Sequence, residues 1–323
     1  MSARNSSAPN RPNLSAETIG LEESRRFCKR LATSHYENFL VCSILLPRRL
    51  RQPFYSIYAF CRTADDIADE SGSSDLALGG LADLQRRVDW LFDSPETAVE
   101  AIHEQDRSST SRPDGGPKTP SALLCPALSE TIATFGLSKQ PFDDLLSAFR
   151  QDQHQTEYES ESDLLDYCRR SANPVGRMIL ELADCCDVEN AALSDEICTG
   201  LQLANFWQDV SRDYAIGRIY LPREERRAFG VDVASLAGDS TPPALRDLLR
   251  VLCERAEQHF RRGLPLAERV PRWLAADIKL FAHGGLETLA AIRRIQFDCL
   301  RIRPTVPKLR QMGLVARAMV GLL

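Results

Sequence analysis

The stretch NFWQDVSRDYAIGRIYLP, residues 205–222, decides the fold of this chain. It carries two acids four positions apart, Asp209 and Asp213, in a run that is otherwise largely apolar and aromatic. At about 100° per residue, four polar side chains fall in one helical stripe about 80° wide: Gln202, Asn205, Asp209 and Asp213. A polar stripe on an apolar helix is either its solvent face or the lining of a polar cavity.

A second stretch upstream, YSIYAFCRTADDIADE at residues 55–70, has the same design. The same rotation places four side chains within about 60° of one another: Tyr58, Arg62, Asp65 and Asp69. Asp66 falls beside this stripe, and we expect it behind the site. Like charges at this spacing weaken a helix. Two helices that each tolerate such a pair therefore favour the cavity interpretation over two solvated faces.

Four carboxylates that line one cavity repel one another unless a cation lies between them. Mg²⁺ suits such a site, because it prefers oxygen ligands and is usually held by one or two carboxylates plus substrate phosphates. Zinc would need histidine or cysteine at ligand spacing, which the five histidines and ten cysteines do not show. Arg62 and Arg218 can hold phosphate oxygens. The residues predict a diphosphate clamped by Mg²⁺ beside an apolar cavity.

The bulk properties of the 323-residue chain exclude several classes of protein. A net charge of −5 without a long basic block argues against nucleic-acid binding. The cysteines are scattered without a CxxC pair, the first 20 residues are polar, and no run approaches about 18 apolar residues. We therefore expect a cytoplasmic protein with reduced thiols, and peripheral membrane contact stays open. The run VPKLRQMGLVARAMVGLL, residues 306–323, predicts either a final core helix or a surface that docks on a membrane.

Helical periodicity dominates the whole chain, so an all-α fold is expected. We predict a disordered tail over 1–20, one domain over 21–323, and a flexible surface loop over 103–121, which is rich in Ser, Pro and Gly. The predicted helices are roughly 21–34, 51–70, 76–92, 122–135, 139–152, 162–185, 194–215, 242–263, 271–283 and 286–303.

Four segments, in this order, resemble motifs of the squalene and phytoene synthases. They are HYENFLVCSILLP (35–47), YAFCRTADDIAD (58–69), DYCRRSANPVG (166–176) and QLANFWQDVSRDYAIGRIYLP (202–222). The resemblance covers about residues 20–305. It implies a single-domain isoprenoid synthase fold with a central apolar cavity between two aspartate-bearing helices.

The resemblance also implies a role for individual residues. The implied Mg²⁺ ligands are Asp65, Asp69, Asn205, Asp209 and Asp213. The implied substrate-binding residues are His35, Arg62, Gln202, Asn205, Arg218 and Tyr220. The implied catalytic residues are Tyr58, Arg62 and Tyr167. The ring faces of Phe39, Phe206 or Trp207 could stabilise a cation, and plain core packing is the alternative for each. For His35 the alternative is a helix cap or a place in the core. For Arg218 and Tyr220 the alternative is that they anchor a loop. No nicotinamide cofactor is expected.

Two departures point to a subfamily. Condensing members usually carry Ala-Gly or Ala-Ser before Val-Gly, where this chain has Asn173 and Pro174, and Leu-Arg before the second acidic motif, where it has Trp207 and Gln208. These features resemble the hydroxysqualene synthases of the three-enzyme bacterial route to squalene and hopanoids. That resemblance implies loss of diphosphate from presqualene diphosphate, rearrangement of the cation and capture of water. Our own hypothesis is that the polar turn at residues 172–174 seats this water, which makes Asn173 a further catalytic candidate. Coupling to other enzymes of the squalene pathway is a further expectation.

Three alternatives remain open from the sequence. The chain could condense two farnesyl or geranylgeranyl diphosphates to presqualene diphosphate, squalene or phytoene. It could be a non-catalytic helical assembly factor, although the four acids of the two motifs are all present. It could be an all-α nucleotide-diphosphate hydrolase, which would turn over nucleotides and ignore prenyl chains.

Overall fold

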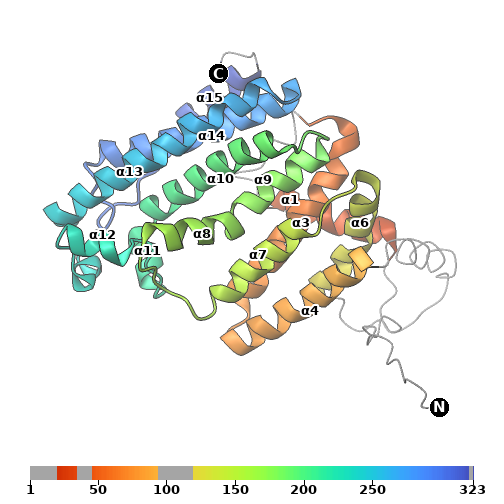
Figure 1. The fold of residues 1–323 in the computed structure, drawn as a ribbon, viewed down its shortest axis with the longest axis horizontal. Coiled ribbons are helices and arrows are strands. Elements are labelled where there is room, and N and C mark those ends of the chain that lie inside the picture. Colours follow the sequence, from red (N-terminus) through yellow and green to blue (C-terminus); the bar gives the residue numbers. More distant parts are fainter. Residues whose placement is uncertain (1–19, 35–45, 94–118, 320–322) are drawn as a thin grey trace, which may run out of the picture.

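The computed structural model of the chain describes residues 20–34, 46–93, 119–319 and 323, and it consists of packed helices (Figure 1). Apart from an isolated bridge between Glu157 and Ile219, these described residues contain no strand, which confirms the all-α prediction. The helices are α1 (Leu21–Ser34), α3 (Arg48–Glu70), α4 (Ser74–Asp93), α6 (Pro120–Phe135), α7 (Gln140–Gln151), α8 (Glu161–Ser171), α9 (Asn173–Leu182), α10 (Val188–Gln208), α11 (Val210–Ala215), α12 (Arg223–Ala228), η1 (Val233–Ala237), α13 (Pro243–Gly263), η2 (Leu264–Glu268), α14 (Arg272–Arg294) and α15 (Lys308–Met319).

The helices pack around two central ones. In the C-terminal half, α10 packs against α9, α13 and α14, and in the N-terminal half α3 packs against α1, α4 and α6. Each half buries its own hydrophobic cluster, and Ile179 and Trp273 contact both clusters. The two helices that carry the acidic motifs are therefore held at the centres of the two halves, where packing fixes their relative position.

Local sequence signals set several helix ends. The hydroxyl of Thr119 accepts a hydrogen bond from the backbone N–H of Ala122 at the start of α6, and Gly136 ends that helix with φ of 62°. Ser160 and Asp163 form a capping box at the start of α8. These ends agree with the predicted helices to within two residues.

The helix predicted over 162–185 is wrong as a single element. It is divided into α8 and α9 at Ala172, whose backbone has φ of −115° and ψ of −49°. The reason is Pro174, which lies in the first turn of α9, where its missing N–H costs no helical hydrogen bond.

The helix predicted over 194–215 is also interrupted. Asp209 lies between α10 and α11 with φ of −106° and ψ of 16°, so the two acids of the motif lie on different helical segments. The simple rotation from Asn205 to Asp213 therefore does not hold beyond Asp209.

The break predicted near residues 283–286 is absent. α14 runs unbroken from Arg272 to Arg294 through two glycines. A Cβ on Gly285 would lie 2.2 Å from a ring atom of Phe260, so this glycine allows α13 and α14 to approach closely. The helix ends where Gln296 and Phe297 take positive φ values of 52° and 60°.

The C-terminal run forms α15, which packs against α14 but is a surface helix rather than a core helix. Leu309 is 83% exposed and Met312 67%, whereas Ala318 is buried. Among the described helices, none is both long enough and apolar enough to cross a membrane.

Some predictions fall outside the described residues. His35, Phe39, nearly all of the tail 1–20 and most of the loop 103–121 are among them, and α6 already begins at Pro120 inside the predicted loop. The nine described cysteines form no disulfide, as expected, although Cys186 is exposed.

Candidate active site

The last two turns of α3 carry the first acidic motif. Arg62 lies between two of its acids: Nη1 is 2.9 Å from Asp65 Oδ2, and Nη2 is 2.5 Å from Asp66 Oδ1. Asp66 therefore shares Arg62 with Asp65, a member of the predicted stripe. Asp69, one turn beyond Asp65, contacts a different arginine, Arg218.

Arg218 joins the two acidic motifs. Its Nη2 donates to Asp69 Oδ1 at 2.9 Å, and its backbone N–H donates to the carbonyl oxygen of Asp213 at 2.8 Å. The turn before it depends on Gly217, which has φ of 80°. The segment that follows the second motif thus turns back to the first one, so the structure places Arg218 between the motifs as well as at a loop.

Asp209 has a partner that the sequence reasoning missed. Arg303 donates to both of its carboxylate oxygens, from Nε at 2.6 Å and from Nη2 at 2.9 Å, in a bidentate pair. Gln208 supports this arginine, because its Nε2 donates to the carbonyl oxygen of Pro304 at 2.6 Å. Arg303 lies in a non-helical segment 94 residues away in the sequence, so no periodic pattern could have associated it with the motif.

Asp65 and Asp213 remain short of positive charge despite these arginines. Burial, followed by the nearby Asp69, raises the pKa of Asp65 to about 6. Burial and Asp209 raise the pKa of Asp213 to about 7. Both shifts mean that the negative form of each carboxyl is disfavoured, as expected where several acids share one site.

The donor set fits Mg²⁺. It consists of carboxylate oxygens together with the amide of Asn205, which is exposed on α10, and these are the oxygen ligands that Mg²⁺ prefers. Within the ranges that the structure describes, no three His, Cys, Asp or Glu side chains already converge as a metal site. The acids pair with arginines instead. Their fit to Mg²⁺ therefore rests on the oxygen chemistry of the donors and not on an assembled metal site.

Beside the acids lies a wall of stacked aromatic rings. Phe206 and Tyr220 stack with centroids 3.7 Å apart and an interplanar angle of 10°, and Tyr167 lies 6.1 Å from Tyr220 and 6.3 Å from Phe206. All three side chains are buried. The structure therefore brings together Tyr167 from one motif with Phe206 and Tyr220 from another, and these aromatic rings can stabilise a nearby cation.

Asp152, at the end of α7, is a second residue that the sequence reasoning missed. It accepts a hydrogen bond of 2.9 Å from the hydroxyl of Tyr167. Burial raises the pKa of Asp152 to about 6, although that hydrogen bond favours its charged form. An acid at a helix C-terminus is unfavourable for the helix dipole. A negative charge at the end of a predicted helix is visible in the sequence, and this signal could have identified Asp152.

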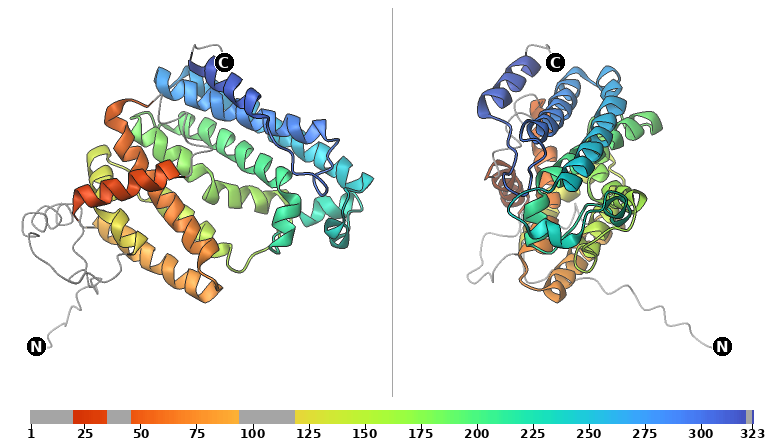
Figure 2. Two further views of the ribbon diagram at one scale, coloured as in Figure 1. Left: turned by 180° about the vertical axis from the view of Figure 1, so that it is seen from behind. Right: turned by 90° about the vertical axis from the view of Figure 1, so that its left-hand side faces the viewer.

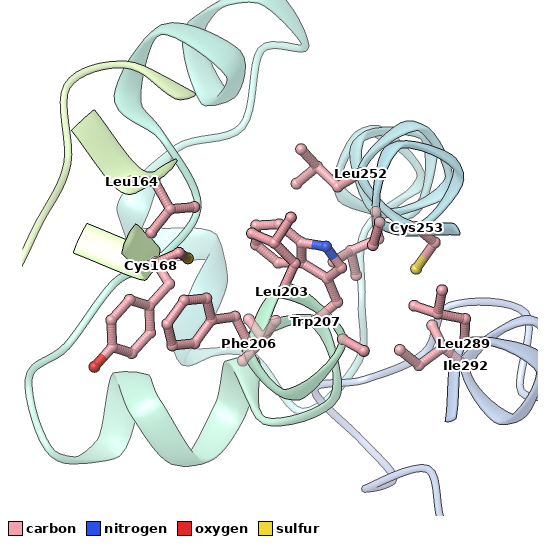
Figure 3. Packing of buried hydrophobic residues seen from close by; sticks show 14 of the residues in the cluster. Leu164, Cys168, Leu203, Phe206, Trp207, Leu252, Cys253, Leu289 and Ile292 are labelled. Atoms are coloured by element: carbon pink, nitrogen blue, oxygen red, sulfur yellow. The ribbon is translucent and has the colours of Figure 1, made fainter. Parts of the chain in front are cut away.

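Trp207 belongs to the core. Figure 3 shows Phe206 directed toward Leu164 and Cys168, whereas Trp207 points to the other side of α10, toward Leu252 and Ile292. Trp207 is only 2% exposed. Of these two neighbouring residues, Phe206 belongs to the aromatic wall and Trp207 packs against α13 and α14.

The remaining predicted site residues lie on α3, α9 and α10. Tyr58 is on α3, where burial raises its pKa, and Gln202 is partly buried on α10. Asn173 is buried at the start of α9, and its Oδ1 accepts a hydrogen bond of 3.1 Å from the Thr199 hydroxyl. That bond ties α9 to α10.

We expect Arg303→Ala to lower kcat/KM by about 10- to 100-fold. The variant loses the charge-assisted bidentate pair with Asp209, and an anion bound at this motif would lose a guanidinium donor. Steady-state kinetics would measure this. Arg301→Ala is the matched control, since Arg301 is exposed on the same segment, and it should retain nearly full activity. Equal losses of kcat/KM in both variants would mean that the overall charge of the segment matters and that the Arg303–Asp209 pair does not.

Comparisons with known proteins identify the family of the chain. A sequence model of the family described as squalene/phytoene synthase matches residues 32–310. The chain is 34% identical over 240 residues to a hydroxysqualene synthase of Rhodopseudomonas palustris, covering 74% of this chain and 73% of that protein. It is 26% identical over 329 residues to a 15-cis-phytoene synthase of Synechococcus elongatus, covering 97% of each.

Solved structures show the same fold. The crystal structure of squalene synthase HpnC from Alicyclobacillus acidocaldarius superposes with a TM-score of 0.73 at 38% identity, covering 86% of this chain and 96% of that one. A dehydrosqualene synthase in complex with a ligand superposes with a TM-score of 0.75 at 24% identity, covering 94% and 97%.

Proposed function

This chain belongs to the squalene/phytoene synthase family, and on that premise we propose that it is a hydroxysqualene synthase that converts presqualene diphosphate and water to hydroxysqualene and diphosphate. The observation that carries the proposal is the sequence similarity at 34% and 31% identity to proteins named hydroxysqualene synthase. The departures at Asn173 and Gln208 support it independently.

The charged groups of the site suit the departure of diphosphate. Mg²⁺ would be held by Asp65, Asp69, Asp209 and Asp213 with Asn205, and would act as a Lewis acid on the leaving group. Arg218 and Arg303 lie at the two acidic motifs and can hold phosphate oxygens bidentately. As the diphosphate leaves with the electron pair of the C–O bond, these guanidinium groups stabilise the growing negative charge.

The aromatic wall suits the other half of the reaction. Tyr167, Phe206 and Tyr220 stack beside the acids, where their π systems would stabilise the cation that remains. The hydrogen bond from Tyr167 to Asp152 fixes the orientation of that ring. Burial raises the pKa of Tyr167 well above its usual value, so the phenol stays neutral and does not trap the cation as an anion.

Gln208 distinguishes this site from one that binds two diphosphates. Condensing members usually carry a basic residue at this position, and Gln208 instead holds the carbonyl oxygen of Pro304. Arg303, beside Asp209, is the cation that this side of the site offers to a diphosphate. A site with one fewer basic residue favours a substrate with a single diphosphate, such as presqualene diphosphate.

The direct test is product analysis. The purified protein is incubated with Mg²⁺ and presqualene diphosphate, and separately with farnesyl diphosphate, without nicotinamide, and the lipids are identified by mass spectrometry. Hydroxysqualene from the first and no turnover of the second is expected. Consumption of farnesyl diphosphate would instead identify a condensing synthase, and turnover of nucleotides alone would identify a hydrolase.

The water-capture step predicts an effect of Asn173 on the product. If Asn173 seats the capturing water, Asn173→Ala should divert product from hydroxysqualene to hydrocarbons or rearranged alcohols. Thr199→Val is the matched control, because it removes the same buried hydrogen bond and costs a similar stability of about 1–3 kcal/mol. Unchanged products in Asn173→Ala, or the same diversion in Thr199→Val, would remove Asn173 from the chemistry.

A further inference from the structure

A basic groove lies on the N-terminal half, away from the acidic motifs. It has a volume of about 680 Å³ and opens between α1, α3 and α6. Its charged lining residues are Glu22, Arg25, Arg26, Lys29, Arg49 and Glu130. Arg25 pairs with both glutamates, and the four cations of the lining exceed its two acids by two charges.

The remaining cations of the groove have no partner within the described part of the chain. Arg26, Lys29 and Arg49 are exposed and form no ion pair there, and the adjacent Arg30 and Arg48 are also exposed and without an ion pair. In a protein with a net charge of −5, such a concentration of positive charge repels itself and does not stabilise the fold. We therefore expect these cations to attract an anion from outside the protein.

Exposed apolar residues lie on the same side of the molecule. Both views in Figure 2 place α1 and α15 on the face that is at the rear in Figure 1. On α15, Leu309 and Met312 are 83% and 67% exposed and, three positions apart, share one face of the helix. Basic residues together with exposed Leu and Met are typical of a surface that contacts lipid headgroups and the upper acyl chains.

We propose that the groove between α1, α3 and α6 docks the protein on an anionic membrane surface, with Leu309 and Met312 entering the lipid boundary. The exposed apolar residues and the negative net charge favour a membrane over a nucleic acid. The acidic motif is compatible with this orientation. Arg49 and Asp65 are separated by about 24 Å along α3, more than two Debye lengths at physiological salt, so anionic lipid does not repel the active site.

The experiment is cosedimentation of the full chain with vesicles. We expect binding to vesicles that contain about one third phosphatidylglycerol, much weaker binding to phosphatidylcholine alone, and release at about 0.5 M NaCl. The triple variant Arg26→Glu, Lys29→Glu, Arg49→Glu should reduce the partition coefficient at least about tenfold. Leu309→Ser with Met312→Ser should also weaken binding, with less dependence on salt.

The matched control is the triple variant Arg86→Glu, Arg227→Glu, Arg250→Glu, in which each arginine is at least half exposed and paired with an acid. It changes the net charge equally and should bind anionic vesicles like the unmodified chain. Equal vesicle binding by wild type on neutral and anionic lipid, or equal loss in both triple variants, would overturn the proposal. Competition by inorganic phosphate in place of lipid would likewise overturn it, by showing a free-anion site. Because vesicle binding needs no turnover, its failure is distinct from failure of the proposed reaction.

Discussion

Arg218→Ala is expected to lower kcat/KM by about 10²–10³-fold, the range found when one preorganised donor to a developing negative charge is removed. Arg218 links the motifs, since its side chain contacts Asp69 and its backbone N–H contacts Asp213. Only 20% of its side chain is exposed, so its interactions are weakly screened by solvent. Without it, the acids lose a counter-charge and the leaving diphosphate loses a bidentate donor.

Steady-state kinetics with thermal unfolding would check this expectation. Arg218→Lys should recover only part of the activity, because a lysine keeps the charge but lacks the planar pair of donors. Arg212→Ala is the matched control, since Arg212 is 67% exposed and 3.9 Å from Asp209, and it should stay within about threefold of the unmodified enzyme. If Arg218→Ala turns over normally, Arg218 is a loop anchor and no more.

Asp277→Asn is expected to stabilise the protein by several kcal/mol near pH 8. Asp277 lies on α14, is 4% exposed, and its Oδ1 has no hydrogen-bond partner among the described residues. Burial raises its pKa to about 8. Each pKa unit corresponds to about 1.4 kcal/mol, so the shift from the ordinary value costs on the order of 5 kcal/mol once the unfolded chain is ionised.

The sign of this effect follows from proton linkage. Because the pKa is raised in the folded state, stability is greatest below about pH 4, falls as pH rises, and levels off above about pH 8. Asn cannot ionise, so the gain in Asp277→Asn should be near zero at about pH 4 and largest at about pH 8. Urea unfolding across this range would measure it, and a gain that does not change with pH would contradict the ionisation argument.

Asp298→Asn is the contrasting control. Asp298 is also buried, but it accepts a hydrogen bond of 2.8 Å from the backbone N–H of Thr241 and lies 3.0 Å from Arg246. These contacts lower its pKa, with the backbone hydrogen bond as the main cause. The substitution should therefore destabilise the fold, since it weakens interactions that require the carboxylate.

Much of the site was predictable because it consists of local patterns. Helical rotation brings Arg62 and Asp65 together within four residues, and this geometry depends only on the backbone of α3. The aromatic residues Tyr167, Phe206 and Tyr220 were singled out by their motifs, and the structure stacks them. Their mutual distances could not be predicted, because Tyr167 lies in another segment and a turn at Gly217 separates Tyr220 from the helix of Phe206.

The sequence by itself determined the helical fold, the two acidic motifs and the oxygen-rich donor set, since periodicity and side-chain chemistry are properties of short segments. Only the tertiary structure decided the partners of the acids: Arg303 for Asp209, and Arg218 for Asp69. It also decided that Trp207 packs in the core while Phe206 faces the site. Contacts across about a hundred residues depend on how whole helices pack, and packing is set by the shapes of buried side chains on every element at once.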